Sequence, residues 1–134
     1  MNATTKTIDL SHFNGSENFH RTTLNRRFIC TDGIKYLADE AGAYWLIDLA
    51  ASHQSARLDR VCEGFQVWTL RKLPPGCKNM AVAECRRDKD APHAVRQLIE
   101  FTDFPFEATG GETFKFYVAG SRDDGWTMML TSEY

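Results

Sequence analysis

Apolar residues return with a helical period in the first half of the chain. Thr31 and Asp32 are residues that favour a helix N-terminus, and four apolar side chains follow at i, i+3, i+4 and i+7: Ile34, Leu37, Ala38 and Ala41. Gly42 then stops this helix or marks a close approach. The next segment, 43–51, is helix-forming and apolar nearly all round. We therefore expect two adjacent helices, of which the second is central.

The pattern changes to a period of two after about residue 60. Lys115 and Tyr117 alternate with three apolar residues, which is typical of a half-buried strand: Phe114, Phe116 and Val118. Turn residues such as Pro74-Pro75-Gly76 separate the apolar segments. The pattern predicts five strands, at Phe65 to Lys72, Met80 to Arg86, Val95 to Thr102, Phe114 to Ala119 and Trp126 to Thr131.

A short hairpin is predicted before the helices. Its strands are 18–22 and 27–31, with Leu24-Asn25-Arg26 as the turn. Helices followed by a series of strands indicate an α+β fold. We expect two adjacent N-terminal helices packed on an antiparallel sheet of about five strands, plus this hairpin, in a single domain spanning residues 1–134.

Composition agrees with a globular protein that has an ordinary core. Hydrophobic residues make up 43% of the 134 positions and charged residues 25%. The chain has no apolar run long enough to cross a bilayer, and its first residues lack the apolar stretch of a signal peptide. We expect a cytoplasmic protein without contact to a membrane.

The four cysteines have no spacing typical of a metal site. Cys30, Cys62, Cys77 and Cys85 form neither a CxxC pair nor a zinc ribbon. We expect free, partly buried thiols and no cofactor, with metal binding as the minor alternative.

Charge is unevenly distributed although the formal net charge is only −2. Residues 71–96 hold seven basic and three acidic side chains, a net of +4. Residues 97–134 hold two basic and seven acidic side chains, a net of −5. Such polarity either steers a charged partner or forms two solvated faces of an ordinary sheet.

Two arginine pairs are candidate anion-binding sites. Arg26-Arg27 and Arg86-Arg87 offer guanidinium groups that suit phosphate or carboxylate. Charged positions at strand ends are the commoner explanation. No aromatic residue is interleaved with these pairs along the chain, as happens in single-strand binders, so we do not expect direct binding of nucleic acid.

Evidence for catalysis is weak. Asp32 is explained as a helix cap or its neighbour, whereas Asp48 is unusual because it falls within the most apolar helix, where a buried carboxylate needs a partner. The histidines form no HxxxH or HExxH pair, and a Cys30–His53 dyad has no local support. GxSxG, P-loop and GxGxxG motifs are missing. We favour a protein that is not an enzyme, and keep a small enzyme or ligand-binding module near Asp32, Asp48, Arg26 and Arg27 as an alternative.

Several short strings resemble one uncharacterised family of small proteins encoded by bacteria, phages and plasmids. They include Thr31-Asp32-Gly33, Tyr36-Leu37-Ala38, Gly42-Ala43-Tyr44-Trp45-Leu46, the segment Ile99 to Pro105 and Ser132-Glu133-Tyr134. The resemblance spans nearly the whole chain, with the strings in the same order. This chain departs from the pattern at 73–92, enriched in Pro, Cys and Arg, and at 108–112. The family is a domain of unknown function, so the resemblance implies a setting on mobile elements and no catalytic residues.

The resemblance implies a protein that binds and blocks a factor of the bacterial host cell. Our leading hypothesis is a counter-defence inhibitor of the anti-CRISPR type, whose partner is a CRISPR effector or another nucleic-acid-handling defence component. Clustered carboxylates could compete for a site built for phosphates; the candidates are Glu107, Glu112, Asp123, Asp124 and Glu133, with Arg26, Arg27, Arg86 and Arg87 as basic contacts. A second alternative is a homodimer or other homo-oligomer that pairs through an exposed edge strand such as Trp126 to Thr131.

Overall fold

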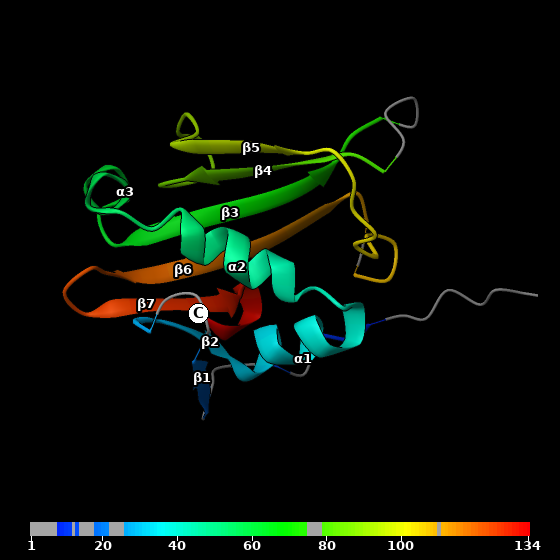
Figure 1. Ribbon diagram of the computed structural model, residues 1–134, viewed down its shortest axis with the longest axis horizontal. Coiled ribbons are helices and arrows are strands. Elements are labelled where there is room, and N and C mark those ends of the chain that lie inside the picture. The colour runs from blue at the N-terminus through cyan, green and yellow to red at the C-terminus, as the bar shows by residue number, and fades with distance from the viewer. Residues whose placement is uncertain (1–7, 12, 14–17, 22–25, 75–78, 110) are drawn as a thin grey trace, which may run out of the picture.

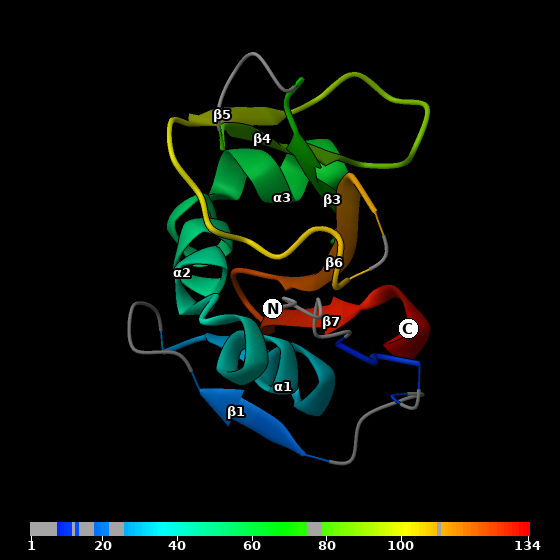
Figure 2. The same ribbon diagram turned by 90° about the vertical axis from the view of Figure 1, so that its right-hand side faces the viewer.

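A seven-stranded sheet and three α-helices make up the described part of the protein in the computed structural model (Figure 1). The structure describes residues 8–11, 13, 18–21, 26–74, 79–109 and 111–134. The strand order is β1-β2-β7-β6-β3-β4-β5, and only the β2–β7 pair among these neighbours is parallel. Figure 2 shows the helices on one side of the sheet.

The elements follow one another with short connections. The strands are β1 (Phe19–Arg21), β2 (Phe28–Thr31), β3 (Phe65–Lys72), β4 (Ala81–Arg86), β5 (Val95–Ile99), β6 (Thr113–Ser121) and β7 (Gly125–Leu130). The helices are α1 (Asp32–Ala41), α2 (Tyr44–Ser52), α3 (Ala56–Cys62) and the short 3-10 turn η2 (Thr131–Glu133). No helix in these described ranges combines the length and apolarity that crossing a membrane requires.

Local capping explains where α1 begins and ends and where α3 begins. The Thr31 hydroxyl accepts a hydrogen bond from the backbone N–H of Ile34 at the start of α1. Gly42 ends α1 in the left-handed conformation, with φ of 62°. At α3 the Ser55 hydroxyl accepts from the N–H of Leu58 at 3.1 Å. The segments predicted as helical lie in α1 and α2, but α3 makes the number of helices three instead of the predicted two.

The core lies between the helices and the sheet. Trp68 of β3 is stacked on Phe116 of β6, with ring centroids 5.8 Å apart, and both side chains are buried. Leu46 and Ala50 of α2 are buried in the same cluster, as expected for a central helix. Alternation on β3, β6 and β7 places every second side chain in this core.

The predicted element count and sheet type are wrong, although the α+β class agrees with the structure. The N-terminal hairpin is not separate: β2 lies parallel to β7, with Cys30 opposite Met128, so the hairpin adds two strands to the main sheet. A mixed sheet of seven strands replaces the expected antiparallel five. The third helix, α3, is missing from the prediction because its seven residues are too few to show a helical period.

The edges of the sheet also differ from the prediction. The segment predicted as an exposed edge, Trp126 to Thr131, forms β7 in the interior of the sheet, between β2 and β6. The edge strands are β1 and β5 instead. The hypothesis of a homo-oligomer paired through β7 is therefore wrong, since both of its backbone edges are occupied.

Candidate functional site

The predicted acidic surface is divided by the fold. Glu112 lies just before β6 and Asp123 and Asp124 just after it, so the nine-residue strand separates them by about 30 Å. Glu107 belongs to the loop that leads to Glu112, and all four of these side chains are exposed. They do not form one patch, and their role in partner binding stays a prediction.

Glu133 is buried and has a structural role. Its Oε1 accepts hydrogen bonds from the Thr31 hydroxyl at 2.6 Å and from the Leu130 N–H at 2.9 Å, and Oε2 accepts from the Gly33 N–H at 3.2 Å. Its relative exposure is 8%, so it does not belong to a partner-binding surface. A carboxylate at the start of α1 is also favoured by the helix dipole.

The basic candidates lie in two separate places. Arg26 and Arg27 line a groove together with Asp124, and the Arg27 guanidinium donates to the backbone carbonyl of Asp123. The predicted basic pair therefore lies against two of the predicted acidic residues. Arg86 lies at the end of β4, and Arg87 has its Nε 3.9 Å from a carboxylate oxygen of Asp88.

The fold brings together only some of the residues proposed for a small enzyme or ligand-binding module. A cavity of about 150 Å³ lies at the junction of β1, β2, α1 and α2; its lining residues are His20, Arg21, Cys30, Lys35, Tyr44, Ile47 and Asp48. Asp48 is exposed there rather than buried, which corrects the expectation from its apolar helix. Arg26 and Arg27 line a different groove, at the other end of β2.

A histidine–aspartate pair stands beside this cavity, but the neighbouring thiol is not activated. His20 Nε2 lies 2.8 Å from Asp32 Oδ1, and this hydrogen bond lowers the pKa of Asp32. Cys30 pairs with His20 across the hairpin, and burial raises the pKa of its thiol to about 11. Because the thiolate is the nucleophile, a thiol with this pKa is inert near neutral pH.

The other cysteine hypotheses gain no support from the described residues. His53 does not form a dyad with Cys30; its Nε2 lies 2.6 Å from Gln97 Oε1 and its ring packs on Trp68. Cys62 and Cys85 are buried free thiols with pKa values raised by desolvation. Cys77 lies outside the described residues. Within the described part of the chain, no three His, Cys, Asp or Glu side chains are grouped as a metal site.

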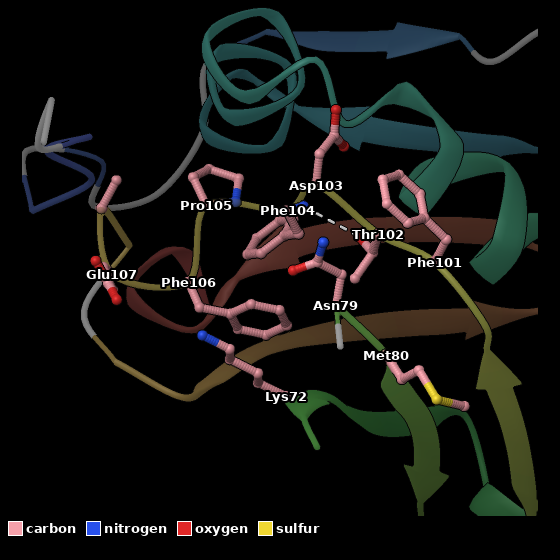
Figure 3. Close-up of a pocket in the computed structure, with 11 residues that line it drawn as sticks. Lys72, Asn79, Met80, Phe101, Thr102, Asp103, Phe104, Pro105, Phe106 and Glu107 are labelled. Carbon is pink, nitrogen blue, oxygen red and sulfur yellow. Dashed lines mark hydrogen bonds between the residues drawn. The ribbon is translucent and has the colours of Figure 1, made fainter. Parts of the chain in front are cut away.

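A second hollow follows the family-like segment after β5. This groove of about 360 Å³ has Lys72 on one wall and residues 101–108 on another (Figure 3). Its loop is held by the Thr102 N–H, which donates to the Asn79 carbonyl, and by the Thr102 hydroxyl, which accepts from the Phe104 N–H. Phe101 is 71% exposed at its rim. In Figure 3 the Lys72 and Asp103 side chains point away from each other.

The most distinctive surface is the face of the sheet that points away from the helices, which we call the open face. Register and alternation assign to it residues that include Phe19, Arg21, Ile29, Phe65, Val67, Thr69, Arg71, Val82, Glu84, Arg86, Arg96, Leu98, Thr113, Lys115, Tyr117, Ala119, Thr127 and Met129. Figure 2 shows α1 and α2 on the opposite side of the sheet. The open face is thus a broad surface without a helical cover.

Three aromatic rings meet on the open face. The Phe65 centroid lies 4.9 Å from that of Tyr117 and 4.8 Å from that of Tyr134, and the two tyrosine rings are 5.8 Å apart. Phe65 and Tyr117 are half-buried, whereas Tyr134 is 81% exposed. We call these three residues the aromatic cluster.

Two arginines and a histidine surround a buried carboxylate on the open face. Glu84 is 8% exposed, and its carboxylate oxygens lie 3.5 Å from Arg86 Nη1, 3.8 Å from His93 Nδ1 and 3.8 Å from Arg96 Nε. The sequence did not predict this arrangement, because His93 and Arg96 reach Glu84 only when the loop after β4 folds back and β5 pairs with β4. A local signal exists only for the apolar part of the open face. Near its start β3 has apolar residues on both faces, with Phe65 and Val67 on one and Trp68 on the other.

Comparison with known proteins identifies the family of this chain but assigns it no function. Searches of curated proteins and of solved structures find no match. The model of one family, described as a family of unknown function (DUF6876), matches residues 4–134. Since this match covers nearly the whole chain, the protein belongs to the family of unknown function DUF6876.

Proposed function

We propose that this protein is a non-enzymatic binding factor that holds a macromolecular partner on its open face. The observation that carries the proposal is the aromatic cluster, which lies on a sheet face that α1, α2 and α3 leave uncovered. Aromatic side chains exposed in contact with one another are typical of binding surfaces, because they bury large areas at little cost in conformational entropy.

The surroundings of the cluster support binding rather than chemistry. Val67 and Met129 flank Tyr117 on neighbouring strands and are half-buried, so the apolar surface extends beyond the rings. Arginine and lysine side chains border this apolar surface, an arrangement like the polar rim of an interface. The cavity beside Asp48, by contrast, holds a thiol whose pKa is raised to about 11.

The biological setting is a further part of the proposal and rests on the resemblance described above. In that setting the protein is a counter-defence inhibitor that acts on a nucleic-acid-handling process of a bacterial host. The open face replaces the acidic residues as the proposed contact surface, since β6 separates Glu112 from Asp123 and Glu133 is buried.

Affinity capture from a bacterial lysate tests the proposal. The bait proteins are the wild type, the double variant Tyr117→Ala/Tyr134→Ala, and Phe101→Ala, which removes an exposed ring outside the open face. We expect the wild type and Phe101→Ala to retain the same macromolecule, detected by mass spectrometry and by nucleic-acid staining. The double variant should lose it.

A charge variant separates loss of binding from loss of folding. Lys115→Glu changes an exposed open-face residue beside Tyr117 and leaves every buried side chain in place. It should also weaken capture while its thermal unfolding stays close to that of the wild type. Capture of one partner by all variants alike, or no capture by the wild type, would refute the proposal.

A further inference from the structure

We propose that the partner held on the open face is single-stranded nucleic acid, with bases stacked on the aromatic cluster and phosphates paired with the neighbouring cations. This inference rests on the proposed function and names the chemical class of its ligand. Proteins that bind single strands combine these two components, a stacking platform and a basic track for the backbone.

The sheet register places cations directly beside the aromatic cluster. Arg86 of β4 is opposite Val67 of β3, and Val67 is opposite Tyr117 of β6. Two strand spacings, or about 10 Å, therefore separate the backbones of Arg86 and Tyr117. The adjacent row runs from Lys115 through Thr69 and Glu84 to Arg96, so it adds one cation at each end, with the buried Glu84 between them.

The open face is basic although the whole chain is slightly acidic. Its charged strand positions in the described chain comprise five basic residues and one acidic residue, namely Arg21, Arg71, Arg86, Arg96 and Lys115 against Glu84. Glu84 is buried beneath the arginine side chains that it orients, whereas four of the five cations are exposed and Arg86 is half-buried. The surface offered to a partner is therefore positive, which suits a phosphate backbone.

The rings favour unpaired bases over a duplex. A base in a duplex is stacked on its neighbours, so its face is hidden from a flat protein surface, whereas an unpaired base exposes a π-face. Tyr134 is 81% exposed and stands against Phe65 and Tyr117, which supply an apolar floor. A ring of this kind can stack on a base of any sequence.

Other occupants fit the face less well. A second copy of the chain, packed through the same face, would bring two sets of five cations together. An acidic protein would satisfy the cations, but it would need aromatic or apolar side chains placed between its carboxylates, whereas a single strand carries a stackable base with every phosphate. These occupants become outcomes of the experiment.

The sequence argued against nucleic-acid binding because aromatic and basic residues are not interleaved along the chain, but the fold brings them together. Arg86 and Arg87 have no aromatic neighbour along the chain, and for that reason the sequence alone does not predict direct binding of nucleic acid. Pairing of β3 with β4 and β6 interleaves the two residue types across strands instead. Tyr117 is 31 positions from Arg86 in the sequence but only two strands away in the sheet.

Fluorescence anisotropy with the purified full chain tests the inference. The probes are a labelled oligo-dT, an unstructured RNA of the same length and a DNA duplex. We expect both single strands to bind more tightly than the duplex. With about four phosphates neutralised, log K should fall with log salt concentration at a slope of about −2.8.

Tyrosine and lysine variants distinguish the contribution of base stacking from that of phosphate neutralisation. Tyr117→Ala and Tyr134→Ala should each weaken single-strand binding by about 5- to 150-fold without changing the salt slope. Lys115→Gln should reduce the magnitude of the slope by about 0.7. Phe101→Ala and Lys35→Gln, which lie in the loop after β5 and on α1, are the matched controls and should bind like the wild type.

Several outcomes would overturn the inference. One is the lack of single-strand binding up to about 100 µM, the weak end of non-specific affinity. Another is equal affinity for the duplex, and a third is full affinity in both tyrosine variants. If oligonucleotides do not bind while lysate capture still depends on Tyr117 and Tyr134, the binding function stands and the partner is a protein.

Discussion

The carboxylate of Glu133 connects the last turn of the described chain to the first turn of α1. It accepts hydrogen bonds from a hydroxyl and two backbone N–H groups, on Thr31, Gly33 and Leu130. An added Cβ at Gly33 would lie 2.5 Å from Glu133 Oε1 and from Leu130 Cδ1, so a larger residue there would require both side chains to shift. The family-like strings Thr31-Asp32-Gly33 and Ser132-Glu133-Tyr134 thus have one structural explanation.

Replacing Glu133 should destabilise the protein. Glu133→Ala leaves the buried donors of Thr31, Gly33 and Leu130 without their acceptor, and we expect the free energy of unfolding to fall by about 2 kcal/mol. Urea denaturation followed by circular dichroism measures it. Glu112→Ala, at an exposed position, should change stability by less than about 0.5 kcal/mol. Equal stability of the two variants would contradict the assignment.

At the scale of elements, the β6–β7 hairpin depends on close backbone approach. Gly120 has φ of 120° and pairs with Trp126, and an added Cβ would collide with the carbonyl of Gly125. The neighbouring backbone cannot withdraw, since the Gly120 N–H donates to the Gly64 carbonyl at 2.9 Å and β7 is also paired with β2. Position 120 therefore requires glycine for two independent reasons: its φ is positive, and there is no room for a Cβ.

Comparing Gly42 with Gly120 separates the effect of backbone conformation from the effect of a steric collision. Gly42 also has a positive φ, of 62°, but nothing lies within 4 Å of the position that a Cβ would take there. Gly42→Ala should lower the free energy of unfolding by about 1–2 kcal/mol through backbone strain alone. Gly120→Ala adds a backbone collision and should cost about 3 kcal/mol or more. Chemical denaturation of both variants measures the difference, and a smaller loss for Gly120→Ala would refute the hairpin argument.

At the scale of the whole molecule, the sheet separates an apolar core face from a basic open face. Its two edges are poor templates for another chain, because β1 has only three residues and β5 carries the exposed Arg96. The open face also resists self-association, since its cations would oppose one another in a symmetric dimer.

We therefore expect a monomer in solution. Size-exclusion chromatography with light scattering should give a mass near the chain's 15.3 kDa, at low and at high ionic strength. Repulsion between open faces is strongest at low salt, where the monomer should be most favoured. A dimer that forms at low salt would contradict both the edge and the charge arguments.

The sequence by itself determined the parts that depend on local physics. A cap and a helical period located α1, helix-forming composition located α2, and the predicted β3 has the same bounds as the observed Phe65–Lys72. Strand ends were less accurate: β5 stops at Ile99 rather than Thr102, because the Thr102 N–H donates to Asn79 outside the sheet. Such signals are local because they involve residues only a few positions apart.

Only the tertiary structure decided how distant segments meet. The parallel pairing of β2 with β7 joins residues about a hundred positions apart, and no local pattern encodes that choice. The same pairing places Glu133 under Thr31, removing it from the surface where the sequence had placed it. Arg86, Val67 and Tyr117 become neighbours for the same reason. Strand order depends on the free energy of the whole packed core, so the open face exists only once the sheet has assembled.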